Sequence, residues 1–182
     1  VAITGAHNFR SLVLPSYKMN RKGVRKPVAL SYTKQVLRDT FQTGLVDGLE
    51  ADDLMGMMAT SPNSNGKKVI VTVDKDLRGV PGLFLNPTKD DGIEWISEAD
   101  ANRFWVSQAL TGDTSDGYVG CPGIGPKKAE TILSGWDGKD AEDALELLVP
   151  VFAARLKVEN EEAREEAVRQ LRVSRILRAG DY

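Results

Sequence analysis

Apolar residues recur along this chain at the spacings of both strands and helices. Residues 69–73 are almost continuously apolar and β-branched, which is typical of a strand buried on both faces of a parallel sheet. Shorter apolar runs predict further strands at 1–4, 45–46, 83–85 and 93–96. Apolar residues three and four apart predict helices at 31–43, 98–110, 140–156 and 159–177, and one from Asp52 or Asp53 to about Thr60. The pattern therefore indicates an α/β fold.

Two of these helices have a distinct apolar face. In 98–110 that face carries Phe104, Trp105 and Leu110. In 31–43 we expect an inward face made of Val36, Leu37, Thr40 and Phe41, opposite a polar face with Lys34, Arg38 and Asp39.

Composition narrows the class of protein. With 182 residues, of which 41% are hydrophobic and 27% charged, we expect one globular domain with a sizeable core. The single cysteine, Cys121, excludes an intrachain disulfide and fits a reducing compartment. No apolar stretch is long enough to span a bilayer, and the first residues do not read as a signal peptide, so we expect a cytoplasmic protein without membrane partners.

The net charge of -2 conceals a strong segregation of charge along the sequence. Residues 1–38 carry eight lysines and arginines and no acid, whereas residues 39–116 carry fourteen acids and six bases. A basic arm followed by an acidic centre suits a metal-dependent site that grips phosphate. A solvated basic loop is the alternative interpretation of the arm.

Three groups of carboxylates are the main candidates for chemistry: Glu50, Asp52 and Asp53 in LEADD, Asp74 and Asp76 in VTVDKDL, and Asp113 and Asp116 in LTGDTSDG. If the fold brings them together, their repulsion requires a bound cation. An oxygen-only ligand set favours Mg²⁺ or Mn²⁺ over zinc, and two such ions form the arrangement that hydrolyses phosphodiesters. Helix capping is the alternative explanation for Asp52 or Asp53 and for Asp74.

Two further segments have the composition of nucleic-acid contacts. In YKMNR, Lys18 and Arg21 are three residues apart and would share one face of a helical turn, while Gly23 and Pro27 favour mobility after it. The string GCPGIGPKKA, residues 120–129, is the pattern of a helix-hairpin-helix turn, whose amides approach a phosphate backbone with Lys127 and Lys128 nearby. We assign no role to His7, the only histidine.

The ordered motifs NFR, YKMNR, LEADD, VTVDKDL, GDTSDG, PGIGPKKA and RILRAGDY resemble those of the 5′-nuclease superfamily, in particular bacteriophage 5′-3′ exonucleases and the 5′-nuclease domain of bacterial DNA polymerase I. The resemblance covers most of the chain. It implies a twisted, mainly parallel sheet flanked by helices, as in PIN-like nucleases, with an arch over the active site and a helix-hairpin-helix track for duplex DNA.

The resemblance also implies roles for individual residues. Two Mg²⁺ ions would be bound by Glu50, Asp52, Asp53, Asp74, Asp76, Asp113 and Asp116. Lys18 and Arg21 would engage the scissile phosphate as catalytic residues. Contacts with DNA at 5′ ends, flaps or branched duplex would come from Lys18, Arg21, Lys22, Gly123, Gly125, Lys127 and Lys128, and K⁺ would bind at the glycine turn.

Two departures from the family pattern leave alternatives open. No residue precedes Val1 to supply the early aspartate of the family, and Gly5 stands where a second carboxylate usually lies. We therefore expect an N-terminally and C-terminally cut chain, with a nuclease core at 1–116 and the helix-hairpin-helix and C-terminal helices at 117–182. The leading interpretation is a metal-dependent 5′-3′ exonuclease or flap endonuclease, in host cytoplasm if viral. The rivals are a DNA-binding remnant that cannot cut and a PIN-like ribonuclease.

Overall fold

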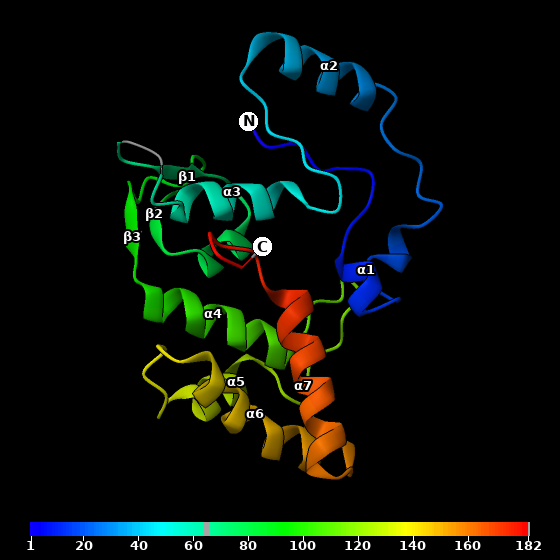
Figure 1. The fold of residues 1–182 in the computed structure, drawn as a ribbon, viewed down its shortest axis with the longest axis vertical. Helices are drawn as coiled ribbons and strands as arrows, with labels where there is room; N and C mark the ends of the chain where they lie inside the picture. Colours follow the sequence, from blue (N-terminus) through cyan, green and yellow to red (C-terminus); the bar gives the residue numbers. More distant parts are fainter. Residues whose placement is uncertain (64–65, 182) are drawn as a thin grey trace.

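A small sheet and a group of packed helices make up the chain in the computed structural model, which describes residues 1–63 and 66–181 (Figure 1). Ser64, Asn65 and Tyr182, the last residue of the RILRAGDY motif, lie outside the described residues. The helices are α1 Arg10–Val13, α2 Leu30–Thr40, α3 Ala51–Thr60, α4 Glu98–Thr111, α5 Pro126–Leu133, α6 Ala141–Leu156 and α7 Asn160–Ser174. The strands are β1 Val69–Val71, β2 Gly82–Leu85 and β3 Glu94–Ile96, and two 3₁₀ turns are η1 Met19–Arg21 and η2 Lys75–Gly79.

The three strands lie in the order β1-β2-β3. β1 and β2 are parallel, with Ile70 opposite Phe84, and β2 and β3 are antiparallel, with Leu83 opposite Trp95. The strands predicted within 69–96 are therefore present, but the described sheet is mixed rather than mainly parallel. The reason is the connection from β2 to β3, which contains no described helix, and a short return of this kind joins antiparallel strands.

Strand β1 is less buried than its sequence predicts. Ile70 is buried, but Val71 and Val73 are exposed, so the prediction of burial on both faces is wrong. The physical reason is that β1 lies at the edge of the described sheet. The predicted strand at 1–4 is reduced to an isolated parallel bridge between Ala2 and Gly44, and the prediction of a strand at 45–46 is wrong, because these residues lie between the bridged Gly44 and Gly48.

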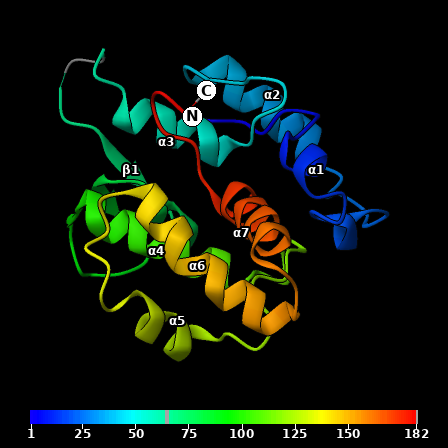
Figure 2. The same ribbon diagram turned by 60° about the horizontal axis from the view of Figure 1, so that its bottom comes forward.

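The larger core lies among α4, α5, α6 and α7 (Figures 1 and 2). Val106 and Leu110 of α4 pack there with Leu148 and Phe152 of α6, all fully buried. A second cluster joins the other end of α4 to the sheet through Ala101, Ile70, Leu77, Val80, Phe84, Ile96 and Ile176. Because α4 contributes to both clusters, the acidic loop that follows it is held between the sheet and the helical layer.

Helix boundaries agree with the apolar spacing to within a few residues for α3, α4, α6 and α7. α2 forms where helix 31–43 is predicted, but its expected inward face is wrong. None of its residues is buried, and Val36 and Phe41 are exposed, because α2 stands away from the rest of the chain (Figure 1). No helix of the described residues has the length and apolar character needed to cross a membrane.

Candidate active site

The acidic motif LEADD starts α3 through a capping box. Glu50 is the N-cap with extended backbone, and its own amide donates to the Asp53 carboxylate at 3.0 Å, while the Glu50 side chain accepts from the Asp53 amide. The predicted caps, Asp52 and Asp53, lie inside the first turn instead. Acids in this turn are favoured by the positive end of the helix dipole. Helix initiation thus accounts for two of the three acids without any metal.

Asp53 has a structural environment that sets it apart from the other predicted metal ligands. It is fully buried, and Arg10 forms a bidentate pair with it, with N–O distances of 2.8 and 2.7 Å. The amide of Leu177 donates to the same carboxylate at 3.1 Å. Both oxygens are therefore satisfied by protein donors, and the structure does not bring Asp53 to the other carboxylates as a free ligand.

Arg10 joins the start of α3 to the C-terminal segment, a role that the sequence reasoning missed. Its Nε donates to the carbonyl of Val173 at 2.9 Å, its Nη2 also donates to the carbonyl of Arg175, and its Nη1 lies 3.4 Å from Glu50. The guanidinium is 3% exposed. The available signal in the sequence was its place in the NFR motif, whose last residue begins the short helix α1.

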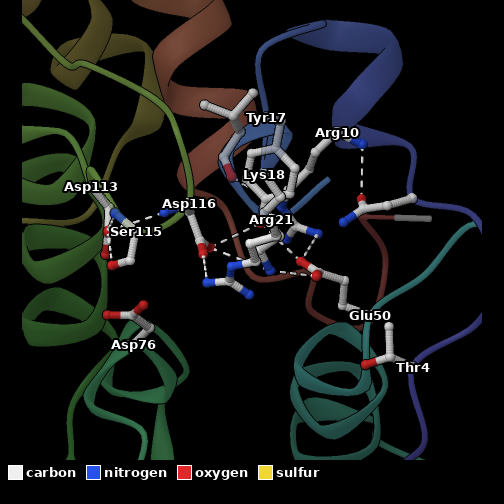
Figure 3. Close-up of polar contacts among 12 residues, drawn as sticks. Thr4, Arg10, Tyr17, Lys18, Arg21, Glu50, Asp76, Asp113, Ser115 and Asp116 are labelled. Carbon is white, nitrogen blue, oxygen red and sulfur yellow. Dashed lines mark hydrogen bonds and ion pairs between the residues drawn. The ribbon is translucent and has the colours of Figure 1, made fainter. Parts of the chain in front are cut away.

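Lys18 and Arg21 reach the carboxylates from the basic arm (Figure 3). Lys18 Nζ lies 2.5 Å from Glu50 Oε1 and 3.4 Å from Asp116 Oδ2, and Arg21 Nη2 lies 2.6 Å from Asp116 Oδ1. The Tyr17 hydroxyl oxygen lies 2.9 Å from Glu50 Oε2 and 3.1 Å from Asp116 Oδ2, so its single proton can be donated to either carboxylate. Although burial raises the pKa of Glu50, Lys18 and then Arg10 outweigh it, so that this pKa lies below its usual value.

Backbone contacts attach the base of this arm to the loop 113–117. Lys18 has a left-handed backbone with φ of 53°, and its amide donates to the carbonyl of Asp116 at 2.7 Å. Asn20 donates from its side chain to the carbonyls of Thr114 and Ser115. A Cβ at Gly117 would lie 2.7 Å from a carbonyl of the arm, so only glycine permits this approach. These backbone contacts fix the position of the Lys18 Cα, from which the side chain extends.

The remaining acids come from the end of the sheet and the loop after α4. Asp74 is the N-cap of η2 and accepts from the Asp76 amide at 2.9 Å, as the capping alternative predicts. Asp76 accepts from Gln108 at 2.7 Å. Burial raises the pKa of Asp76, and Asp74 adds to this, as do the two acids of the loop. Asp113 is held by the amide of Ser115 at 2.7 Å.

Asp52 has the most strongly perturbed carboxylate in this group. Burial raises its pKa from 3.8 to about 6, and repulsion from Asp74 and Glu50 contributes. A pocket of about 30 Å³ is bordered by Glu50, Asp52, Asp76 and Asp116. These mutual effects show that acids from three separate motifs share one region of the molecule.

The carboxylate oxygens of this region are potential ligands for a divalent metal, and the neighbouring cations Lys18 and Arg21 compete for them. Within residues 1–63 and 66–181, no three acids are close enough to hold one ion as they stand. Lys18 and Arg21 occupy the oxygens of Glu50 and Asp116. Against this, Asp52 and Asp76 are oxygen donors whose ionisation is opposed by neighbouring acids, a penalty that a hard cation relieves. The donor chemistry therefore fits Mg²⁺ or Mn²⁺, once the two basic side chains leave these acids.

The predicted DNA-binding turn precedes α5. Gly123 has φ of 72°, and Gly125 is the N-cap of α5 without a side-chain cap. Pro126 has no N–H, and the amides of Lys128 and Ala129 both donate to the carbonyl of Gly125 at 3.0 Å. Lys127 is exposed, and the Lys128 ammonium donates to the carbonyl of Gly123 at 2.9 Å. Lys22 is exposed beside η1. The helix-hairpin-helix assignment stays a prediction.

Position 5 has no room for the carboxylate that the family pattern places there. A Cβ built on Gly5 would lie 2.8 Å from the carbonyl oxygen of Val46. The neighbouring Thr4 accepts from the Ala51 amide at 3.1 Å and so supports the start of α3 (Figure 3). Restoring an acid at position 5 would require the backbone to move.

Comparison with known proteins identifies relatives of this arrangement. Residues 1–81 match the family described as 5′-3′ exonuclease, N-terminal resolvase-like domain. The exonuclease of Escherichia phage T7 is 36% identical over 139 residues, which are 74% of this chain and 46% of that protein. The flap endonuclease Xni of Vibrio vulnificus strain CMCP6 is 30% identical over 182 residues, or 91% of this chain and 67% of that protein.

The fold is also similar to that of the bacteriophage T5 D15 protein co-crystallised with metal ions. The TM-score is 0.68 at 19% sequence identity, over 94% of this chain and 73% of that chain. This similarity confirms the predicted fold class. The chain spans less than half the length of the T7 and T3 phage exonucleases that it matches. Sequence and fold together show that the chain belongs to the 5′-nuclease superfamily of phage 5′-3′ exonucleases and flap endonucleases.

Proposed function

We propose that this chain is a divalent-metal-dependent 5′-3′ exonuclease or 5′ flap endonuclease that hydrolyses DNA phosphodiesters. The observation that carries the proposal is the meeting of Lys18 and Arg21 with the acids of two distant motifs, Glu50 and Asp116. Cations beside a cluster of carboxylates are what a phosphoryl-transfer site needs, because the cluster binds metal and the cations stabilise phosphate charge.

The metal would be two Mg²⁺ or Mn²⁺ ions, held directly or through water by Glu50, Asp52, Asp74, Asp76, Asp113 and Asp116. Asp53 is left out of this set because Arg10 and Leu177 already use both of its oxygens. When bound, such ions lower the pKa of coordinated water and neutralise charge on the phosphate. Solved structures of this fold include the T5 D15 protein co-crystallised with metal ions and the T5 5′-exonuclease with bound zinc.

The basic side chains of the arm have their own part in the reaction. A phosphate that approaches the acids would compete with Glu50 and Asp116 for Lys18 and Arg21, because its oxygens are alternative partners for the same cations. The left-handed backbone at Lys18 keeps its ammonium over the acids. Removing one such contact to a developing charge typically costs about 3 kcal/mol of barrier.

The DNA would be gripped at two places. Lys18, Arg21 and Lys22 would contact the strand near its 5′ end, and the turn at Gly123, Gly125, Lys127 and Lys128 would contact duplex backbone, with K⁺ at the same turn. The exposure of Gly123, Gly125 and Lys127 and the positive end of the α5 dipole support a phosphate contact. A solved relative of the fold is the T5 D15 flap endonuclease in a complex with DNA and metal ions.

The test is Asp74→Ala, assayed on 5′-labelled flap and nicked DNA with Mg²⁺. We expect loss of cleavage by at least about a hundredfold while DNA binding in EDTA persists. The exposed Asp91→Ala is the matched control and should cleave normally. Equal cleavage by Asp74→Ala and the wild type, in preparations that lose activity with Lys18→Ala, would remove the acids from the mechanism.

A second function is favoured by the crowding at Gly5. A chain without the carboxylate usual at that position could bind branched DNA without cutting it. This alternative predicts salt-dependent binding of flap DNA and no product with either Mg²⁺ or Mn²⁺. Metal-dependent nicking by the wild type that disappears in Asp74→Ala would exclude it.

A further inference from the structure

A second pocket, apart from the acidic site, is lined by residues of α4, the start of α6 and the end of α7. Its volume is about 740 Å³, within the range of small-molecule sites. Trp105, Leu145 and Leu171 provide an apolar wall, and Phe9 borders it. The pocket shares no lining residue with the small pocket between the carboxylates.

Two arginines of the RILRAGDY motif lie in this pocket with hydrogen-bonding groups unused. The Arg175 guanidinium stacks over the Trp105 ring at 4.3 Å, and its Nε donates to Asp181 at 2.9 Å. Arg178 is 6% exposed, and its Nη2 donates to the carbonyl of Gly79 at 2.8 Å. Among the described residues, Arg175 Nη1 and Arg178 Nε are buried without any acceptor. Each of these unpaired buried N–H groups is costly unless an acceptor arrives, and both residues line the same pocket.

The carboxylates of the pocket do not compensate for its cations. The positive groups are Lys139, Arg172, Arg175 and Arg178, and the negative groups are Glu98, Glu142 and Asp181. Two of these groups are paired outside the pocket, Glu142 with Arg164 at 2.5 Å and Lys139 with Asp137 at 3.2 Å, which leaves three arginines and two acids. Burial lowers the pKa of Arg178 to about 10, and the charge of Arg175 lowers it further, while Asp181 and Glu98 act in the opposite direction. An additional anion would therefore be stabilised here.

We propose that this pocket binds the phosphate group of a nucleotide, with the Arg175 and Arg178 guanidinium groups on the phosphate and the nucleoside against the wall of Leu145 and Leu171. Paired guanidinium groups match the oxygens of a phosphate better than ammonium groups do. The mostly apolar wall and the Arg175–Trp105 stack offer flat surfaces for a base. This inference does not depend on cleavage by the acidic site.

The test titrates deoxyadenosine 5′-monophosphate, inorganic phosphate and deoxyadenosine into the full chain in EDTA, so that the acidic site holds no metal. Binding is followed by calorimetry and by the indole N–H signals of the three tryptophans. We expect the nucleotide to bind and to shift the Trp105 signal, whose N–H donates to the carbonyl of Leu171 at 2.9 Å, and to leave the exposed Trp95 signal unchanged. The nucleoside should bind at least about tenfold more weakly.

Two variants locate the site. Arg175→Gln should weaken nucleotide binding at least about tenfold, and Lys139→Gln, at an exposed side chain that should not affect folding, should weaken it about threefold. Arg169→Gln, whose guanidinium pairs with Glu166 outside the pocket, is the matched control and should bind like the wild type. If phosphate binds as tightly as the nucleotide and both respond to Lys139→Gln, the site is one for free phosphate. No shift of Trp105 by any probe, or equal binding by Lys139→Gln and the control, would overturn the proposal.

Discussion

Asp52→Asn should stabilise this protein, although it removes a proposed metal ligand. The carboxylate is disfavoured by burial and by repulsion from Asp74 and Glu50, which raise its pKa from 3.8 to about 6. In the part of the chain that the structure describes, no hydrogen bond to this carboxylate offsets the penalty. An asparagine side chain has nearly the same shape and no charge, so the penalty disappears with the substitution.

The size of the effect follows from the two pKa values. One pKa unit corresponds to about 1.4 kcal/mol, so the charged form of Asp52 costs the fold at most about 3 kcal/mol above pH 7. The charge also gains up to about 1 kcal/mol from the dipole of α3, in whose first turn it lies. We therefore expect a net gain of roughly 2 kcal/mol, or about 5 °C in Tm for a chain of this size.

The sign of the pH dependence is fixed by the direction of the shift. Because the folded state holds this proton more tightly than the unfolded state, Asp52 lowers stability progressively as pH rises from about 4 to about 6. Below that window the protonated wild type and Asp52→Asn should be equally stable. Above it the variant should be more stable by a constant amount.

Thermal and urea unfolding in EDTA, at several pH values from 4 to 8, measures this difference. The exposed Asp91→Asn is the control and should follow the wild type throughout. Addition of Mg²⁺ should raise the Tm of the wild type more than that of Asp52→Asn, because only the wild type has this acid to offer the metal. A variant that is less stable than the wild type at pH 8, or a difference that does not change with pH, would refute the electrostatic argument.

Three further predictions concern other parts of the site. Arg10→Gln should destabilise the fold by about 3 to 5 kcal/mol in urea, because Asp53 would stay buried without its cation, whereas the exposed Arg164→Gln should change stability by less than about 0.5 kcal/mol. Gly120→Ala should cost at least about 2 kcal/mol, since its Cβ would lie 2.4 Å from a backbone nitrogen at φ of 62°, while the unobstructed Gly125→Ala should cost less than about 1 kcal/mol by the same assay. Metal-dependent cleavage measured from pH 5 to 8 should fall as pH drops through about 6, because protonated acids do not bind Mg²⁺, and a flat profile would exclude these acids as ligands.

The spacing of apolar residues predicts a helix well where the apolar face of that helix packs into the core. Helices α4, α6 and α7 appear where apolar spacing places them because their apolar faces pack on one another. The same pattern in α2 predicts a helix but gives a wrong inward face, because the described residues provide no surface for Val36 or Phe41 to pack against. The spacing of apolar residues shows which face of a helix could be buried. Whether that face is buried depends on another part of the chain packing against it.

The site follows the same rule: the motifs identify which acids belong to it, but contacts with distant residues decide the environment of each acid. The acids of LEADD, VTVDKDL and GDTSDG come near one another as expected, through segments that their motifs identify. Sequence reasoning could not separate Asp53 from its neighbour Asp52, because the difference is made by Arg10, Val173 and Leu177, far away along the chain. The left-handed backbone of Lys18 likewise depends on the loop of Asp116, with which it exchanges a hydrogen bond.

The contacts of Arg10 have a consequence for the order in which the protein can mature on the ribosome. A nascent chain that ends before Val173 already contains every acid of the site, but it lacks the carbonyl acceptors of Val173 and Arg175 and the amide of Leu177. The guanidinium and Asp53 would then be buried without their remaining partners, an arrangement that is too costly to persist. Arg10 and Asp53 can therefore take up their final positions only after residues 173–177 have been synthesised, so this end of the acidic site is organised later than the sheet that borders it.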